Sequence, residues 1–177
     1  NLKGVINSEV SRLGVIIDHT DTTQSQTRLF TTKDGTVVAV EGNRTLVLSA
    51  GTWAWRRLTV GAGVDGEEHF SLAIDTGTNE VVVMAFGVEE RFAIADFDQV
   101  LFDGGHGNDT LSIVGNFPIN LYLFGGDGID SLSGGHADSY LFAGSGNDTM
   151  IARGGDSILT GGRGDDTYLF YDNWGTA

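Results

Sequence analysis

Four short stretches of this chain share one spacing of glycine, aspartate and a large residue. They span residues 104–112, 125–133, 143–151 and 161–169, and each fits G-G-x-G-x-D-x-U-x, where U is leucine, methionine or tyrosine. The third copy has alanine in place of its first glycine. A repeat at a fixed period indicates stacked units, because one such unit cannot bury its apolar face alone.

The distances between the copies predict that two nine-residue units make one coil. The copies at 125, 143 and 161 start 18 residues apart, and the units between them, 134–142 and 152–160, keep a large apolar residue but lose the glycine pattern. The step from 104 to 125 is 21 residues, which is one nonapeptide and a twelve-residue variant, 113–124. Intact and degenerate units therefore alternate.

This alternation predicts an all-β fold, a parallel two-sheet β-roll in which all four intact turns lie on one edge. Each strand is expected to have about three residues, with neighbouring coils about 4.8 Å apart and the large residues pointing inward. In the degenerate units the aspartates, Asp138 and Asp156, come one position early, which leaves calcium binding on their edge an open question.

The residue types of the intact turns indicate the ligand. Carbonyls that converge on one point require positive φ values, which glycine adopts cheaply, and the terminal aspartate adds a carboxylate. A pocket of about six oxygens at about 2.3–2.6 Å suits Ca²⁺, whereas Mg²⁺ holds its waters tightly and Zn²⁺ prefers nitrogen or sulfur. Four turns leave three gaps, so we expect about three Ca²⁺ ions, at Asp109/Asp130, Asp130/Asp148 and Asp148/Asp166.

Residues 104–169 resemble the RTX, or haemolysin-type, calcium-binding repeat of secreted bacterial proteins. The resemblance implies that each ion lies between two turns, held by the position-six aspartates and by carbonyl oxygens of the first four residues of each turn. Carried over, the carbonyl candidates are Gly104, Gly105, His106, Gly107, Gly125, Gly126, Asp127, Gly128, Ala143, Gly144, Ser145, Gly146, Gly161, Gly162, Arg163 and Gly164.

The resemblance also implies type I secretion and an extracellular or cell-surface location. At low cytosolic calcium the aspartates repel one another and the glycines keep the chain open. Extracellular calcium modules bind at about 10⁻⁴–10⁻³ M, so we expect ions to fill the gaps outside the cell, and binding that requires the fold contributes folding free energy.

Charge and composition exclude several functions. Asp and Glu number 24 against 10 Lys and Arg, a net charge of −14, so no nucleic acid is expected as a partner, because phosphates need basic residues. With no cysteine, a disulfide or thiolate metal site is excluded. No apolar run approaches the roughly 20 residues of a membrane span, and no export signal is visible at the start of the sequence.

A shift in composition near residue 100 predicts two parts. Residues 100–177 hold 17 of the 27 glycines and form the expected calcium-binding roll, while residues 1–99 are expected to form a mainly-β domain or cap, with coils possible from about residue 80. In the first part, residues 2–13 have the pattern of a short helix and residues 18–28 that of a polar loop. Strands are predicted at 37–41, 45–49, 55–60, 69–74 and 80–86.

Other candidate sites have simpler interpretations. Trp53 and Trp55 share one strand face and are a candidate ligand-binding pair that stacks on a sugar, although core or interface packing is the favoured interpretation. His106 and His136 occupy variable positions expected to be exposed spacers and not zinc ligands. Asp18, His19, Thr20 and Asp21 are expected to be solvent-exposed.

The sequence predicts a module that is not an enzyme. It holds no H-E-x-x-H, G-x-S-x-G or G-x-x-x-x-G-K-[ST] motif. Two alternatives remain open at this stage. One is an adhesin or surface-layer segment that binds a glycan or a cell-surface protein through residues 1–99. The other is the non-catalytic part of an RTX protease, lipase or epimerase.

Overall fold

The computed structural model describes residues 16–19, 28–31, 37–40, 44–48 and 66–171, and these residues form strands, turns and one short 3-10 segment, η2 (Ile94–Asp96). The expected all-β class is therefore confirmed. Within the described ranges no helix is long and apolar enough to cross a bilayer. The expected helix at 2–13 and the expected strand at 55–60 lie outside them.

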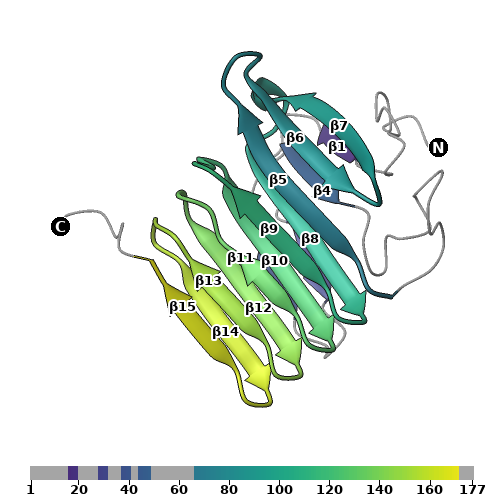
Figure 1. Cartoon of the computed structure of the whole chain (residues 1–177), viewed down its shortest axis with the longest axis vertical. Helices are drawn as coiled ribbons and strands as arrows, with labels where there is room; N and C mark the ends of the chain where they lie inside the picture. The colour runs from purple at the N-terminus through teal and green to yellow at the C-terminus, as the bar shows by residue number, and fades with distance from the viewer. Residues whose placement is uncertain (1–15, 20–27, 32–36, 41–43, 49–65, 172–177) are drawn as a thin grey trace.

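Two sheets lie face to face and carry most of the strands (Figure 1). The first sheet has the order β1-β4-β8-β10-β12-β14 and the second has the order β15-β13-β11-β9-β5-β6-β7. A separate antiparallel pair consists of β2 (Arg28–Thr31) and β3 (Val37–Val40). The strands of the first sheet are β1 (Ile16–His19), β4 (Arg44–Leu48), β8 (Gln99–His106), β10 (Asn120–Asp127), β12 (Ser139–Ser145) and β14 (Ile158–Arg163). Those of the second are β5 (His69–Asp75), β6 (Glu80–Ala85), β7 (Val88–Ala93), β9 (Thr110–Val114), β11 (Ser131–Ser133), β13 (Thr149–Ala152) and β15 (Thr167–Phe170).

The C-terminal part is a parallel β-roll, as the repeat predicts. Each coil runs through one strand of the first sheet and one of the second, in the pairs β8/β9, β10/β11, β12/β13 and β14/β15, and neighbouring coils pair in parallel. In these four coils the strands of the first sheet are longer than the expected three residues, at six to eight. They are longer because the ladder continues into the turns, where Gly105, Gly126, Gly144 and Gly162 pair in register.

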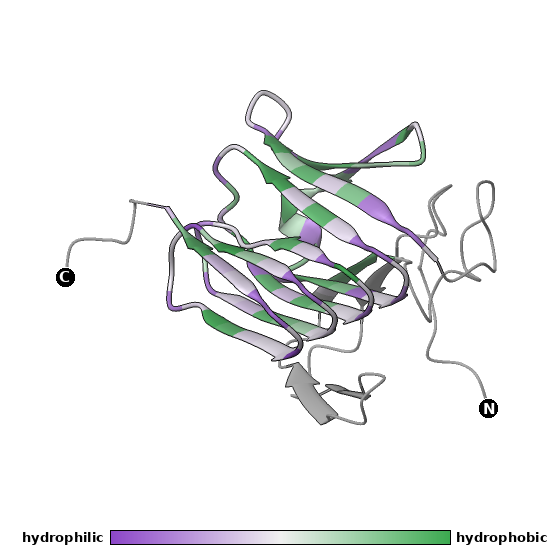
Figure 2. Ribbon diagram, turned by 60° about the horizontal axis from the view of Figure 1, so that its bottom comes forward, coloured by the Kyte–Doolittle hydropathy of each residue, from purple (hydrophilic) through white to green (hydrophobic). Residues whose placement is uncertain are grey.

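The large residue of each intact unit points into the space between the sheets. Leu111, Leu132 and Met150 are buried in one cluster with residues of the first sheet such as Leu121. The alternation of apolar and polar positions is visible along the strands in Figure 2. Tyr168 is 42% exposed, because β15 pairs on one side only among the described strands.

Parallel pairing extends further toward the N-terminus than expected. β4 pairs in parallel with β8, and β5 pairs in parallel with β9, so β4 and β5 add a coil before residue 100. The sequence alone allows coils of the roll from about residue 80, but the described strands there do not pair in parallel. β6 and β7 instead pair antiparallel as hairpins that continue from β5, because tight turns at 75–79 and 86–87 reverse the chain.

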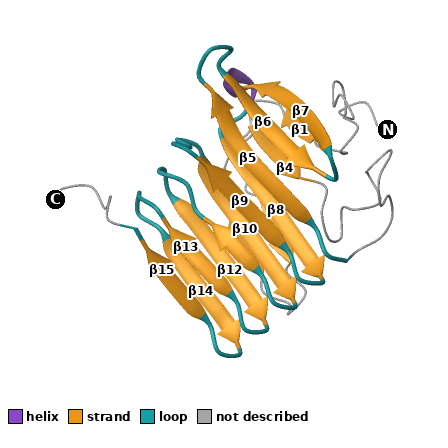
Figure 3. Ribbon diagram, viewed as in Figure 1, coloured by secondary structure: helices purple, strands orange, loops and turns teal. Residues whose placement is uncertain are grey.

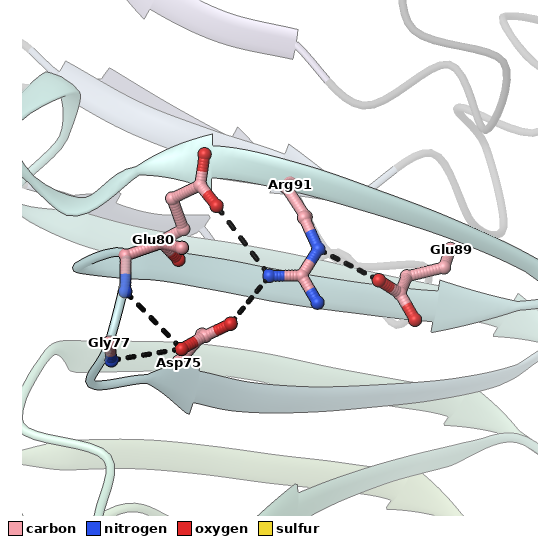
Figure 4. A network of polar contacts seen from close by, with 6 residues as sticks. Asp75, Gly77, Glu80, Glu89 and Arg91 are labelled. Atoms are coloured by element: carbon pink, nitrogen blue, oxygen red, sulfur yellow. Dashed lines mark hydrogen bonds and ion pairs between the residues drawn. The ribbon is translucent and has the colours of Figure 1, made fainter.

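An exposed ion-pair cluster lies on these hairpins (Figure 4). Arg91 donates from Nη1 to Asp75 Oδ2 at 2.7 Å and from Nε to Glu89 Oε1 at 2.8 Å. Asp75 Oδ1 also accepts from the amides of Gly77 and Thr78 at 2.9 and 3.3 Å. The hydrogen bond from Arg91 is the main reason that the pKa of Asp75 is lowered. The cluster ties β7 to the β5–β6 turn, but solvent screens exposed pairs of this kind.

The region expected to be a loop at 18–28 contains strand ends. Asp18 and His19 belong to β1, which pairs antiparallel with β4, and Arg28 begins β2. Strands form there because each finds a partner elsewhere in the chain, which local polarity does not reveal. Thr20 and Asp21 lie outside the described residues.

The twelve-residue variant unit has a packing role. Its additional length places Phe117 in the core, with no exposed surface. The Phe117 carbonyl accepts from the amide of His136 at 2.9 Å, and the Phe117 amide donates to His136 Nδ1 at 3.4 Å. His136 is therefore half-buried and fastens neighbouring coils to each other, and is not an exposed spacer.

Candidate metal-binding edge

The four intact turns lie on a single edge of the roll. Each one leads from a strand of the first sheet to a strand of the second, so the turns stack in the order of their coils, while the degenerate units make the return connections (Figure 3). The glycines at positions two and four of every turn have positive φ, from 84° at Gly105 to 144° at Gly146. The expected need for glycine is met at these two positions.

The stacking is close enough to exclude side chains. A β-carbon placed at Gly126 would collide with the carbonyl oxygen of Gly105, and one at Gly128 would collide with that of Gly107. The same relation repeats between each later turn and its predecessor. The turns therefore lie in register, with equivalent carbonyls stacked along the edge.

The position-six aspartates form a ladder of hydrogen bonds from turn to turn. The amide of Asp109 donates to Oδ1 of Asp130 at 2.7 Å, and that of Asp130 donates to Oδ1 of Asp148 at 2.8 Å. The amide of Asp148 in turn donates to Oδ1 of Asp166 at 3.1 Å. Asp109, Asp130 and Asp148 are almost completely buried, and Asp166 is half-buried. The structure thus brings all four predicted aspartates into one line.

In Asp109 and Asp130 the second carboxylate oxygen lies beside a carbonyl oxygen of the next turn. Oδ2 of Asp130 and Oδ2 of Asp148 are buried and accept no hydrogen bond. A β-carbon at Gly125 would meet both Asp130 Oδ2 and the carbonyl oxygen of Ala143, the first residue of the next turn. At Gly104 it would meet Asp109 Oδ2 and the carbonyl oxygen of Gly125.

Carboxylate and carbonyl oxygens from successive turns therefore converge on one small space. Buried polar atoms in native proteins nearly always have a partner, and an all-oxygen donor set matches a hard cation such as Ca²⁺. Among the described residues no group of three or more His, Cys, Asp or Glu side chains lies close enough to hold an ion. The backbone carbonyls are therefore an essential part of any such donor set.

The electrostatics of the ladder are unfavourable without a cation. Burial raises the pKa of Asp130 to about 7, the negative charge of Asp148 acts in the same direction, and the hydrogen bond from the Asp109 amide opposes both. The pKa of Asp148 is also raised, mainly by burial and further by the charge of Asp166. A bound cation would favour the ionised form of both groups.

The third residues of the turns face a different environment. In the last three intact turns, each carbonyl oxygen at position three accepts a hydrogen bond from the amide of the position-four glycine in the preceding turn, at 2.8–2.9 Å; these carbonyls belong to Asp127, Ser145 and Arg163. This bond leaves one lone pair on each oxygen for another partner. His106 is exposed, with Nδ1 at 3.7 Å from Asp127 Oδ2.

On the opposite edge, the amide of Asp156 donates to Asp138 Oδ1 at 2.8 Å. Asp138 is half-buried and Asp156 is exposed, so this pair lacks the enclosure of the main ladder. Trp53 and Trp55 lie outside the described residues, and their role as a ligand-binding pair stays a prediction.

One residue of the ladder was not predicted. The amide of Glu68 donates to Asp109 Oδ1 at 2.8 Å, and Glu68 is 1% exposed. The available signal was the G-E-E of residues 66–68, where a glycine precedes an acidic residue by two positions, as in the intact turns. A single partial copy is too weak to recognise without its stacking partner.

Comparison with known proteins agrees with this geometry. The fold and the edge define a β-roll, a parallel solenoid with glycine- and aspartate-rich turns along one side. The family model of the RTX calcium-binding nonapeptide repeat, which describes four copies of the repeat, matches residues 122–150 and 142–169. The chain therefore carries RTX repeats in these residues. No curated protein and no solved structure matches the chain.

Proposed function

We propose that the edge of intact turns binds Ca²⁺ in the gaps between stacked turns and that this binding drives the module to fold. The observation that carries the proposal is the pair of buried oxygens, Asp130 Oδ2 and Asp148 Oδ2, which accept no hydrogen bond. The first of them lies beside the carbonyl oxygen of Ala143 in the next turn. The match to a calcium-binding repeat family supports the choice of ion. The proposed role is structural and not catalytic.

Three gaps separate the four turns, so about three ions are expected, one each at Asp109/Asp130, Asp130/Asp148 and Asp148/Asp166. In each gap the proposed ligands are the position-six carboxylates and carbonyls of the first four residues of the two turns. The first-position carbonyls have the best support, since those of Gly125 and Ala143 lie beside the aspartate Oδ2 atoms. The third-position carbonyls already accept a hydrogen bond and have less capacity.

Calcium-dependent folding follows from the same features. Glycine loses more conformational freedom on folding than any other residue, and three stacked aspartates are buried together. The lost conformational entropy of the glycines and the burial of negative charge both oppose folding until a divalent cation neutralises the carboxylates. The free energy of calcium binding therefore becomes free energy of folding. A module of this kind suits a protein that passes through the secretion machinery unfolded and folds outside the cell, where calcium is abundant, and we propose that location.

The test is a circular dichroism titration of chelated protein. Adding Ca²⁺ is expected to increase the β-sheet signal with a midpoint of about 10⁻⁴–10⁻³ M, and Mg²⁺ at the same concentrations is expected to have little effect, because it dehydrates reluctantly. A spectrum that Ca²⁺ leaves unchanged, or that Mg²⁺ changes equally, would contradict the proposal.

A further inference from the structure

We propose that the calcium-binding edge extends one turn further toward the N-terminus, with Glu68 in the place of the position-six aspartate, so that a fourth cation site lies between Glu68 and Asp109. This inference rests on the proposed function of the four intact turns. It assigns a metal-binding role to a segment, residues 66–68, that lies outside the recognised repeats.

The backbone of Glu68 makes both hydrogen bonds that define position six. Its amide donates to Asp109 Oδ1 at 2.8 Å, as the amide of Asp109 donates to Asp130 Oδ1 at 2.7 Å. Its carbonyl accepts from the amide of Thr110 at 2.8 Å, as the carbonyl of Asp109 accepts from Ser131 at 2.8 Å. Glu68 is therefore the first member of the aspartate ladder.

The residues on either side of Glu68 match the repeat as well. A β-carbon at Gly107 would lie 2.6 Å from the carbonyl oxygen of Gly66, just as one at Gly128 would collide with that of Gly107, so Gly66 takes position four. After Glu68, His69 pairs with Thr110 and Phe70 pairs with Leu111. Phe70 is 1% exposed and takes the inward position of the large apolar residue.

Position five follows the same pattern on the surface. Asn108 Oδ1 accepts from the amide of Ile129 at 2.8 Å, and Asn108 Nδ2 donates to Glu67 Oε1 at 3.3 Å on the other side. Glu67 is exposed, whereas Glu68 is buried. Of the two adjacent acids, the one at position five is therefore exposed and the one at position six is buried, as for Asn108 and Asp109 in the next turn.

The chemistry of Glu68 suits a cation in this gap. Glu68 is 1% exposed and Asp109 has no exposed surface, so two acidic residues are buried next to each other at this end of the ladder. Glutamate is one methylene longer than aspartate and serves as a bidentate Ca²⁺ ligand in other calcium loops. By equivalence with Ala143 and Gly125, the carbonyl of Gly104 is the first-position oxygen that faces this site.

The consequence is a coupling between the two parts of the chain. An ion between Glu68 and Asp109 would fasten the β4/β5 coil to the roll, and with it the hairpins of β6 and β7. Calcium would then order residues on both sides of the shift in composition near residue 100.

The experiment counts bound ions by native mass spectrometry of the full 177-residue chain at millimolar Ca²⁺. The expected result is four ions on the unaltered chain, three on Glu68→Gln, and four on the matched control Glu67→Gln, which removes the same charge from the exposed neighbour. Glu68→Asp, which keeps the carboxylate, is expected to retain four. Circular dichroism in Ca²⁺ checks that each variant is folded.

The outcomes separate this inference from the function on which it rests. No bound Ca²⁺ on the unaltered chain overturns both. Three ions on the unaltered chain, or four that persist in folded Glu68→Gln, overturn the fourth site and leave the proposed function intact. If Glu68→Gln does not fold, the count on the unaltered chain and on Glu68→Asp decides, since three ions there exclude a fourth site.

Discussion

The amide of Asp130 donates a hydrogen bond to Oδ1 of Asp148 across 2.8 Å, while Oδ2 of Asp148 stays buried and accepts none. Each carboxylate therefore serves two purposes. One oxygen connects its turn to the preceding turn, and the other is the oxygen that we propose binds the ion. This division would let one residue both fix the register of the coils and contribute to the proposed metal site.

Replacing Asp148 by asparagine tests the role of Oδ2. The change keeps the shape of the side chain but removes the charge from the two gaps that this residue borders, so the midpoint of the Ca²⁺ titration is expected to rise at least about tenfold, or ~1.4 kcal/mol. Asp165→Asn is the matched control, because Asp165 is exposed and lies at position five. Equal midpoints for the two variants in circular dichroism would argue against Asp148 as a ligand.

Glycine at the second position of a turn is expected to be essential for the stacking. Gly144 has a φ of 114°, and a β-carbon there would collide with the carbonyl oxygen of Gly126. Gly144→Ala is therefore expected to destabilise the Ca²⁺-bound module by more than about 2 kcal/mol, since strain in a left-handed backbone costs about 1–2 kcal/mol before any clash. Urea unfolding in Ca²⁺ measures the change.

The control is Gly115→Ala. Gly115 also has positive φ, at 74°, but a β-carbon there has no neighbour within 4 Å, so only the backbone strain applies. A loss of stability as large as that of Gly144→Ala would show that conformation alone, and not close stacking, explains the glycines.

The metal-free chain is expected to gain structure as the pH falls. In the folded state burial raises the pKa of Asp130 to about 7, while the unfolded value is about 3.9. The folded state then binds more protons than the unfolded state between these values, so stability is highest below about pH 4 and is lost as the pH rises through about 7. The β-sheet signal of desalted, metal-free protein should therefore be stronger at pH 5 than at pH 8.

Asp130→Asn should weaken this dependence, because it removes one of the two ladder carboxylates whose pKa is raised. In the presence of Ca²⁺ the trend is expected to reverse, since the ion competes with the proton, and affinity should rise with pH. A metal-free signal that increases from pH 5 to pH 8 would contradict this account.

The inward residues of the intact units are expected to dominate stability once calcium is bound. Leu132 is fully buried in the core cluster, and Leu132→Ala is expected to cost about 2–5 kcal/mol. Ile129→Ala removes similar bulk from a side chain that is 61% exposed, and a change within about 0.5 kcal/mol is expected. Thermal unfolding at a fixed Ca²⁺ concentration compares the two variants. Similar losses of stability would contradict the assignment of Leu132 to the core.

Much of the roll follows from local features of the sequence. A glycine at positions two and four specifies a backbone conformation at that residue, and a period of 18 residues specifies which turns stack on one edge. The line of Asp109, Asp130, Asp148 and Asp166, the inward position of Leu111, Leu132 and Met150, and the return path through the degenerate units could all be predicted in this way.

The sequence by itself determined the repeating coil, because its signals are carried by single residues at fixed spacing. Only the tertiary structure decided that β4 and β5 form a further coil, that β6 and β7 turn back as hairpins, and that Glu68 joins the ladder. Strands such as His69–Asp75 show an alternation common to any half-buried strand, and their partners are chosen by hydrogen bonds to residues about 40 positions away. That choice depends on the whole assembled edge, which no local pattern contains.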